Sequence, residues 1–185
     1  MGDEDKSTKA ESLKEEGKKL FRIVEYEEAA ACFDEAHALY VELDNARGQG
    51  KMLNNLGLIH TQEERWEQAV EAFNKARTTF ESLEDKDGQA HALGNLGDMY
   101  RHQGDKETSV EYLKEAANLF HETGDWEKET TTLRVISRIR LGQARWFEAL
   151  HFYDLSLACV KPPGLKERIL QRLVQIPLNM LSPPQ

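Results

Sequence analysis

Cysteine and proline are both scarce in this sequence, which has two cysteines and five prolines among 185 residues. Cys32 and Cys159 stand far apart and form no CxxC pair or metal-ligand spacing, which excludes a disulfide-rich domain and argues against a zinc site. Each lies among apolar residues in a helical pattern, so we expect two buried thiols in a reducing compartment. Five prolines and twelve glycines are also too few for a low-complexity chain.

Long hydrophobic runs are absent as well. No stretch approaches the roughly 18 to 20 apolar residues that a membrane-spanning helix needs, and residues 1–7 lack the apolar core of a signal peptide. We therefore expect no membrane span, a cytoplasmic location, and a short acidic flexible tail at residues 1–9.

The sequence also lacks the short motifs of common enzyme sites. It contains no GxxxxGK[ST], GxGxxG, HExxH or GxSxG pattern. Its six histidines form no HxH or HxxxH pair with a carboxylate at ligand spacing. We expect a non-enzymatic protein with no catalytic residue, no cofactor and no metal. The net charge of −9 argues against nucleic acid, since an acidic surface repels phosphate backbones.

What the sequence does contain is an internal repeat of 40 residues without gaps. The segments 13–20, 53–60, 93–100 and 133–140 share large apolar residues and one small residue, which is Gly17, Gly57, Gly97 or Ser137. Matching positions in the second half of each unit are Tyr26, Trp66, Lys106 and Trp146; Ala29, Ala69, Ser109 and Ala149; and Phe33, Phe73, Leu113 and Tyr153. Agreement over four units predicts one structural unit repeated four times.

Each unit reads as two helices. Leu53, Leu56, Gly57 and His60 recur at i, i+3, i+4 and i+7, which places them on one helix face. The small residue lets the second helix approach closely, and the aromatic residues and alanines of that helix fill the contact. Units are joined near 44–45, 84–85 and 124–125, where Asp and Asn suit the N-cap of the next helix.

Small and large apolar residues alternating in this way over two helices per unit resemble the tetratricopeptide-repeat (TPR) family over roughly residues 10 to 160. The 40-residue period resembles the long-helix branch of Pins/LGN-type adaptors, kinesin light chains and bacterial Rap-type regulators. The resemblance implies an all-α TPR superhelix, an α-solenoid of four helix-turn-helix repeats. We expect repeats at 10–49, 50–89, 90–129 and 130–163.

The pattern changes after Val160, where Lys161, Pro162, Pro163 and Gly164 end a helix. Residues 164–181 then read as one more amphipathic helix, followed by a tail at 182–185. A terminal repeat leaves an apolar face bare, so we expect this helix to cap the array. A docking helix for a partner and the start of a fifth unit are the alternatives.

Stacked helix pairs form a curved array whose concave wall is made by the first helix of each pair. By register, this wall carries seven basic and three acidic residues, about +4 on an acidic protein. We expect it to bind an extended, acidic segment of a protein partner. In the long-repeat relatives an asparagine ladder holds the peptide main chain, which the resemblance transfers to Asn55 and Asn95. The predicted peptide-binding residues are Lys14, Lys18, Lys51, Asn54, Asn55, Asn95, Arg101, Arg134 and Arg138.

Two other functions remain open on the sequence alone. The family's carboxylate clamp grips the C-terminal tail of chaperones, and only Lys14 and Asn55 of this chain fit its pattern, so a chaperone-tail-binding co-chaperone is one alternative. A structural subunit that uses its convex face or C-terminal helix is the other. In either role we expect a scaffold or adaptor that is a monomer or self-associates weakly.

Overall fold

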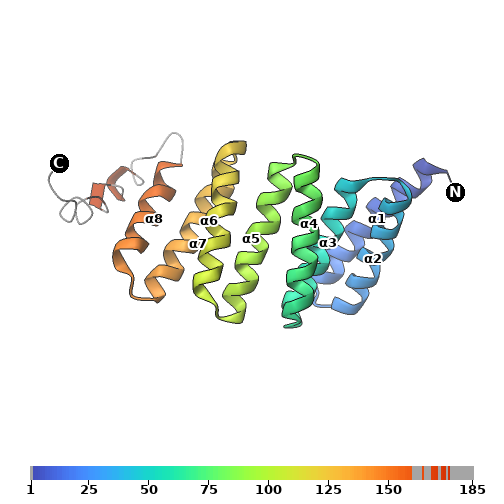
Figure 1. Ribbon diagram of the computed structural model, residues 1–185, viewed down its shortest axis with the longest axis horizontal. Helices are drawn as coiled ribbons and strands as arrows, with labels where there is room; N and C mark the ends of the chain where they lie inside the picture. Colours follow the sequence, from blue (N-terminus) through green and yellow to red (C-terminus); the bar gives the residue numbers. More distant parts are fainter. Residues whose placement is uncertain (1, 160–163, 165–167, 171, 174, 176–185) are drawn as a thin grey trace.

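The computed structural model describes residues 2–159, 164, 168–170, 172–173 and 175. Residues 2–159 form eight helices and no strand, stacked in one row with each helix running opposite to the next (Figure 1). The helices are α1 (Asp3–Arg22), α2 (Tyr26–Glu42), α3 (Ala46–Gln62), α4 (Trp66–Ser82), α5 (Lys86–Gln103), α6 (Lys106–Thr123), α7 (Trp126–Gly142) and α8 (Trp146–Ala158). The predicted array of four helix pairs is confirmed.

The helices follow one another at a constant spacing. From α2 to α8, each begins 20 residues after the one before, so every 40-residue unit is two equal halves. Each turn holds one residue with a left-handed backbone, again 20 residues apart: Val24, Asp44, Glu64, Glu84, Gly104, Gly124 and Ala144. In six of the seven turns the next amide then donates to the carbonyl five residues back, as from Asn45 to Tyr40 at 2.9 Å, which closes the helix end. Turns of one kind reverse the chain in one way and keep the row regular.

Side-chain caps start the first helix of each later pair, as the sequence predicts. Asn45, Asp85 and Asp125 accept a hydrogen bond from the backbone N–H three residues on, at 2.9, 3.0 and 3.0 Å. These bonds satisfy donors that have no partner inside the helix. Caps at the same place in three successive units fix where each first helix begins.

Within a pair, the small residue is where the two helices meet. A Cβ added at Gly57 of α3 would lie 2.6 Å from the ring of Phe73 on α4, which is fully buried. Gly17 stands in the same relation to Phe33. In the fourth pair, the Ser137 hydroxyl of α7 donates to the Ala149 carbonyl of α8 at 2.7 Å. The sequence-based explanation of the small residue is therefore correct.

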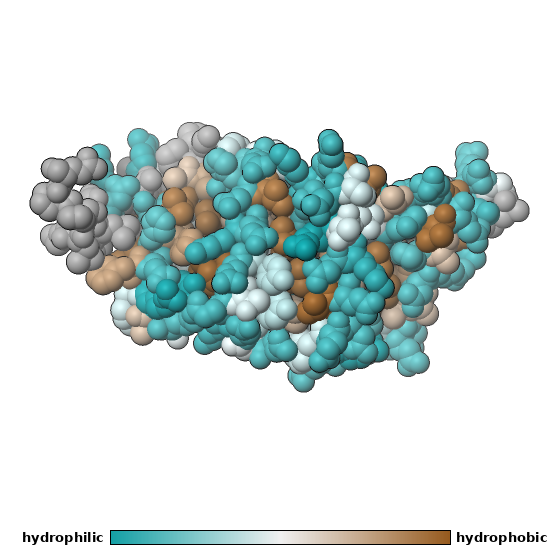
Figure 2. Space-filling view, in the orientation of Figure 1, coloured by the Kyte–Doolittle hydropathy of each residue, from teal (hydrophilic) through white to brown (hydrophobic). Residues whose placement is uncertain are grey.

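Aromatic residues also join one pair to the next. Tyr40 at the end of α2 covers Gly48 of α3, where an added Cβ would lie 2.4 Å from the ring. Phe80 covers Gly88 of α5 in the same way, at 2.3 Å. Glycine in the first turn of a helix thus lets an aromatic ring seal the junction between units. The outer surface in this view is mostly hydrophilic, and hydrophobic atoms show between the helices (Figure 2).

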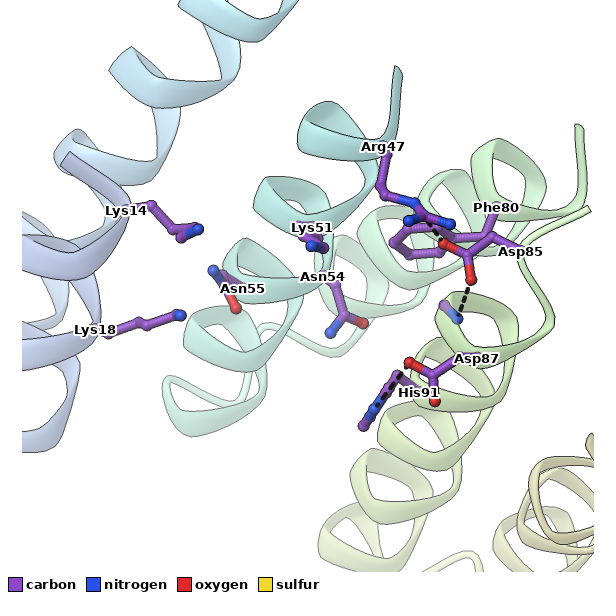
Figure 3. Close-up of a pocket in the computed structure, with 11 residues that line it drawn as sticks. Lys14, Lys18, Arg47, Lys51, Asn54, Asn55, Phe80, Asp85, Asp87 and His91 are labelled. Carbon is purple, nitrogen blue, oxygen red and sulfur yellow. Dashed lines mark hydrogen bonds and ion pairs between the residues drawn. The ribbon is translucent and has the colours of Figure 1, made fainter. Parts of the chain in front are cut away.

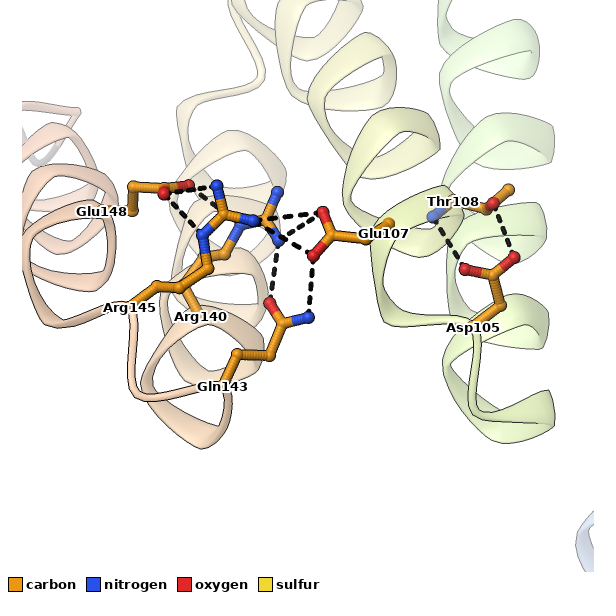
Figure 4. A network of polar contacts seen from close by, with 7 residues as sticks. All are labelled: Asp105, Glu107, Thr108, Arg140, Gln143, Arg145 and Glu148. Carbon is orange, nitrogen blue, oxygen red and sulfur yellow. Dashed lines mark hydrogen bonds and ion pairs between the residues drawn. The ribbon is translucent and has the colours of Figure 1, made fainter.

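The junction of the third and fourth pairs has the corresponding aromatic ring, Phe120, which lies under Lys128 of α7, and it contains a buried charge in addition. Arg140 of α7 occupies the register position of Tyr100 and is 4% exposed. Its Nη1 donates to Glu107 of α6 at 2.7 Å and to Gln143 at 2.8 Å (Figure 4). Its Nε lies 3.2 Å from a carboxylate oxygen of Glu148 on α8, but the two are not aligned for a hydrogen bond. Both carboxylates stay partly hydrated, so the pairing avoids burying three charges together.

The structure differs from the sequence prediction at the N-terminus. Residues 3–9 belong to α1, whereas a flexible tail was expected at residues 1–9. Acidic residues in the first turn favour a helix N-terminus there. Lys6 and Lys9 also reach α2, where they pair with Glu42 at 2.7 Å and Glu35 at 2.5 Å. The tail therefore adds two turns to the first helix.

The predicted capping helix at 164–181 lies largely outside the described residues. Those described between 168 and 175 are helical, and the Gln175 amide lies 3.5 Å from the Asp154 carboxylate of α8. The tail at 182–185 lies outside the described residues. Of the two cysteines, Cys159 is buried as expected, whereas Cys32 is only partly buried.

Replacing Gly57 with alanine should destabilise the protein by about 1 to 3 kcal/mol, because the new methyl group collides with the buried Phe73 ring. This loss should appear even though alanine favours a helix by about 1 kcal/mol over glycine. Urea unfolding followed by circular dichroism measures it. The control is Gly142→Ala at the end of α7, where an added Cβ meets nothing within 4 Å and should be neutral or stabilising. Equal effects of the two changes would contradict this packing.

Arg140→Leu should change the free energy of unfolding little, since leucine is the residue of the first unit at this position and replaces a paired buried charge by an apolar side chain. Glu107→Gln with Glu148→Gln should be more destabilising, because it leaves the buried guanidinium without a carboxylate.

The hydrogen bond from Arg140 lowers the pKa of Glu107. The ion pair's contribution is thus present above the ordinary carboxylate pKa and is lost as the pH falls through the lowered value. Thermal unfolding from neutral to acid pH tests both the order of the two stability losses and the direction of the pH dependence. A larger loss of stability in Arg140→Leu than in the double glutamine variant would contradict the expected order.

Candidate functional site

The first helices of the four pairs, α1, α3, α5 and α7, are called here the first-helix wall. Helices α3 and α5 contact each other directly, although α4 lies between them in sequence. A groove of about 520 Å³ runs across α1, α3 and α5. Because one hollow is lined by first helices of three successive pairs, the wall presents a continuous surface and not separate repeats.

Five of the predicted residues line this groove together. Lys14 and Lys18 come from α1, and Lys51, Asn54 and Asn55 come from α3 (Figure 3). The lysines of α1 face the asparagines of α3 across the groove in this view. The opposite side holds residues that are not among the predicted peptide-binding residues: Arg47, Phe80, Asp85, Asp87, Gly88 and His91.

The cations of the groove differ in how strongly they are already paired. Lys14 donates to Glu11, and Lys18 donates to Glu15 at 2.9 Å, in both cases within α1. Lys51 has no hydrogen bond or ion pair in the described part of the chain, although its charge helps to lower the pKa of Glu11. Lys51 is therefore the cation of this groove that is most available to a ligand.

Glu11 also ties the groove to the core. Hydrogen bonding from Lys14, and then from the Tyr40 hydroxyl at 2.5 Å, lowers the pKa of Glu11. Burial and this carboxylate raise the pKa of Tyr40 in turn. Since Tyr40 packs against Gly48, the edge of the groove is held by the same ring that joins the first two pairs.

Arg47 and Asp85 form an ion pair between units. Arg47 Nε lies 2.9 Å from Asp85 Oδ2, while the other Asp85 oxygen caps α5 by accepting from Gly88 N–H at 3.0 Å. Asp85 had been recognised as a cap only. The 40-residue register gave no signal for this ion pair, because Arg47 and Asp85 do not occupy equivalent positions of their units.

The two asparagines expected to act alike are placed differently. Asn95 Nδ2 donates to Asn54 Oδ1 at 3.0 Å, which links α5 to α3. The Asn55 amide makes no side-chain hydrogen bond within the described chain, and it lines the groove. Asn55 is thus open to a ligand, whereas Asn95 already uses one amide N–H in a hydrogen bond to the neighbouring unit.

The remaining predicted residues lie farther along the wall. Asn95 lines a second hollow of about 460 Å³ between α5 and α7, where carboxylates of Asp98, Asp125 and Glu127 outnumber the one lysine, Lys128. Arg101 and Arg138 line a third of about 550 Å³. The predicted site is therefore three consecutive hollows, basic at the two ends and acidic in the middle.

Arg134 and Arg138 stand one turn apart on α7 and are both exposed. Neither has a hydrogen bond or ion pair within the residues described. Arg101 differs, because it donates to Asp98 at 2.6 and 2.8 Å. Of the predicted arginines, the two on α7 are available to a ligand.

His91 lies where the first and second hollows meet and lines both. Its ring packs edge-on against Phe120 at 5.4 Å and lies 3.8 Å from the Asp87 carboxylate. Burial, followed by the charge of Lys128, lowers the pKa of His91. The imidazole is therefore neutral at neutral pH and adds no positive charge to the wall.

Two structural findings bear on other functions. Among the described residues, no group of three or more His, Cys, Asp or Glu side chains is placed to hold a metal ion. None of the described helices combines the length and apolar character needed to cross a bilayer.

Comparisons with solved structures identify the architecture. Aspartyl phosphate phosphatase F from Bacillus subtilis superposes with a TM-score of 0.81 at 16% identity over 95% of this chain and 48% of that one, so the chain spans about half its length. A kinesin light chain repeat protein from Podosopora anserina gives 0.68 at 12% identity over 95% of this chain and 89% of that one. The N-terminal domain of stress-induced protein-1 from C. elegans gives 0.54 at 18% over 73% and 97%. At these identities the likeness shows the fold alone.

Sequence comparison supplies the family. A comparison with curated proteins found no match. A family model described as tetratricopeptide repeat matches three overlapping stretches, residues 20–82, 48–122 and 88–161. These stretches together span α2 to α8 and most of the chain, and the chain therefore belongs to the tetratricopeptide-repeat family.

Proposed function

We propose that this protein is an adaptor whose first-helix wall binds an extended acidic segment of a protein partner. The tetratricopeptide-repeat fold is in general a protein-interaction scaffold, so a protein partner agrees with the family. The observation that carries the proposal is the row of three hollows along the wall, with unpaired cations at both ends. Those cations are Lys51 on α3 and Arg138 on α7; Arg134, one turn before Arg138, lines none of the three hollows and is exposed beside them.

The order of charges along the wall restricts the kind of segment that it can bind. Basic residues gather around the first and third hollows, and carboxylates around the second. A segment with acidic residues near its two ends and neutral or basic residues between them complements this order. A uniformly acidic segment would meet Asp98, Asp125 and Glu127 in the middle. The wall therefore favours a segment of alternating charge over a simple acidic tract.

Asn55 supplies the contact to the peptide backbone in this proposal. Its amide offers both a donor and an acceptor, which is what an extended main chain requires. It lies between the lysines of α1 and Lys51 of α3, so a bound carboxylate and the backbone next to it would be held at one place. Asn54 and Asn95, already bonded to each other, would add the two N–H groups of Asn54 and the second N–H and carbonyl oxygen of Asn95.

Arg134→Glu with Arg138→Glu should weaken binding of a peptide that carries glutamates at both ends and lysine in the middle by about tenfold or more, since two attractions become repulsions. The affinity should also depend less on salt than in the wild type. Fluorescence anisotropy with the labelled peptide measures both. The control, Lys9→Glu with Lys75→Glu, changes the net charge equally, at lysines that pair with residues of α2 and α4. Equal losses in control and test variants would mean that overall charge, not the wall, attracts the peptide.

Asn55→Ala should weaken the same peptide about three- to tenfold, the effect of one hydrogen bond worth about 0.5 to 1.5 kcal/mol. Thermal stability should stay unchanged, because the amide has no side-chain hydrogen bond to lose within the described chain. Asn118→Ala, at an exposed position of α6, is the matched control. An unchanged affinity in a folded Asn55→Ala protein argues that the peptide backbone lies elsewhere.

A further inference from the structure

The second helices expose the same register positions to solvent, and one helix differs from the rest. These positions hold Glu27, Ala31 and Glu35 in α2; Glu67, Glu71 and Lys75 in α4; Glu107, Glu111 and Glu115 in α6; and Phe147, His151 and Leu155 in α8. All twelve are exposed. Charged residues hold most of these positions in the first three helices, whereas α8 presents two large apolar side chains and a histidine. The three α8 residues are called here the α8 stripe.

The residues that the structure describes leave the α8 stripe exposed. Phe147 is 55% exposed and Leu155 is 39% exposed, and Trp146, which directly precedes the stripe, is 60% exposed. Hydrophobic atoms accordingly show at the α8 end of the molecule (Figure 2). Several large apolar side chains exposed on one helix, outside the core, are typical of a contact with another molecule.

Acidic residues border the stripe. Helix α6 lies beside α8, since Lys114 of α6 reaches the Phe152 ring at 5.3 Å and Glu107 of α6 pairs with Arg145 at 3.1 Å. The exposed charged residues farther along α6 include Glu111, Lys114 and Glu115; Lys114 is directed to the Phe152 ring, and neither of these two glutamates has an ion pair in the described part of the chain. The surface thus joins an apolar row to a row of unpaired carboxylates.

We infer that the α8 stripe docks an amphipathic helix of a partner protein, with the apolar face of that helix on Phe147 and Leu155. Lysines or arginines along one edge of the helix lie toward Glu111 and Glu115 of α6. Apolar contact supplies the affinity and the ion pairs fix the orientation. This surface lies on the second helices and is separate from the first-helix wall, so the protein has two sites for two ligands of opposite charge.

The charges favour this occupant over others. A second copy would bring two acidic proteins together, each with a net charge of −9, along their α6 carboxylates. An anionic membrane surface would be repelled in the same way. Of the chain's own C-terminal residues that the structure describes, Ile169 is 50% exposed and Leu173 is 59% exposed, so neither is buried on the stripe.

The test uses the full chain and two synthetic helical peptides with the same leucine pattern. One carries lysines beside the leucines, and the other carries glutamates. Fluorescence anisotropy should show the lysine peptide binding about tenfold or more tightly than the glutamate peptide. Phe147→Glu with Leu155→Glu should then weaken the lysine peptide by about tenfold or more. These variants should fold, because glutamate occupies the matching positions of α2 and α6.

The sign of the variant's effect separates apolar docking from charge attraction. The double variant makes the protein more acidic, so a peptide held by charge alone would bind it more tightly. Ala31→Glu with Ala38→Glu adds the same charge to exposed positions of α2 and should leave the affinity unchanged or slightly higher. Asn55→Ala should have no effect, which keeps this result independent of the first-helix wall.

Three outcomes would overturn the proposal. Equal or tighter binding of the lysine peptide by Phe147→Glu with Leu155→Glu would place the peptide elsewhere. Sedimentation of the wild type as a dimer that this variant converts to monomer would make a second copy the occupant. Peptide binding that arises only after Ile169→Glu with Leu173→Glu would show that the chain's own C-terminal part covers the stripe.

Discussion

The close approach of two helices at one small residue is the constraint on which the whole array depends. At Gly57, the Phe73 ring occupies the space that any side chain would need, and the same contact recurs at Gly17. Equal spacing of helices and turns repeats this contact every 40 residues. Because each pair is built alike, the first helices fall into one wall and the second helices into another. Both candidate binding surfaces are consequences of that separation.

Much of the fold could be predicted because the 40-residue repeat has no gaps, so that each position of the unit occurs four times in the sequence. The small residue, the caps at Asn45, Asp85 and Asp125, and the membership of each helix pair follow from register alone. The start of α1 was missed, although register places residues 6–9 opposite the first turn of α3 at 46–49; only residues 3–5 correspond to a turn, at 43–45. Lys6 and Lys9 also form ion pairs with α2, which only three-dimensional contact reveals.

The sequence indicated that several residues of the candidate site share one face, but not which of their side chains are already paired. Register placed Lys14, Lys51 and Asn55 on one face, and the structure brings them into one groove. Register could not show which side chains are already occupied, because pairing depends on rotamers and on neighbouring units. The lysines of α1 are held by their own helix, and Asn95 is held by Asn54. Likewise, the apolar α8 stripe stands out only when the four second helices are compared at their exposed positions.

The most direct test of the account is to map where an acidic peptide lies on the full chain by NMR chemical-shift perturbation. The probe carries glutamates at both ends and lysine in the middle. The account predicts shifts concentrated on α1, α3, α5 and α7, with the Asn55 side-chain amide among the resonances that move most. Shifts concentrated on α2, α4, α6 and α8, with the Asn55 amide unmoved, would contradict it.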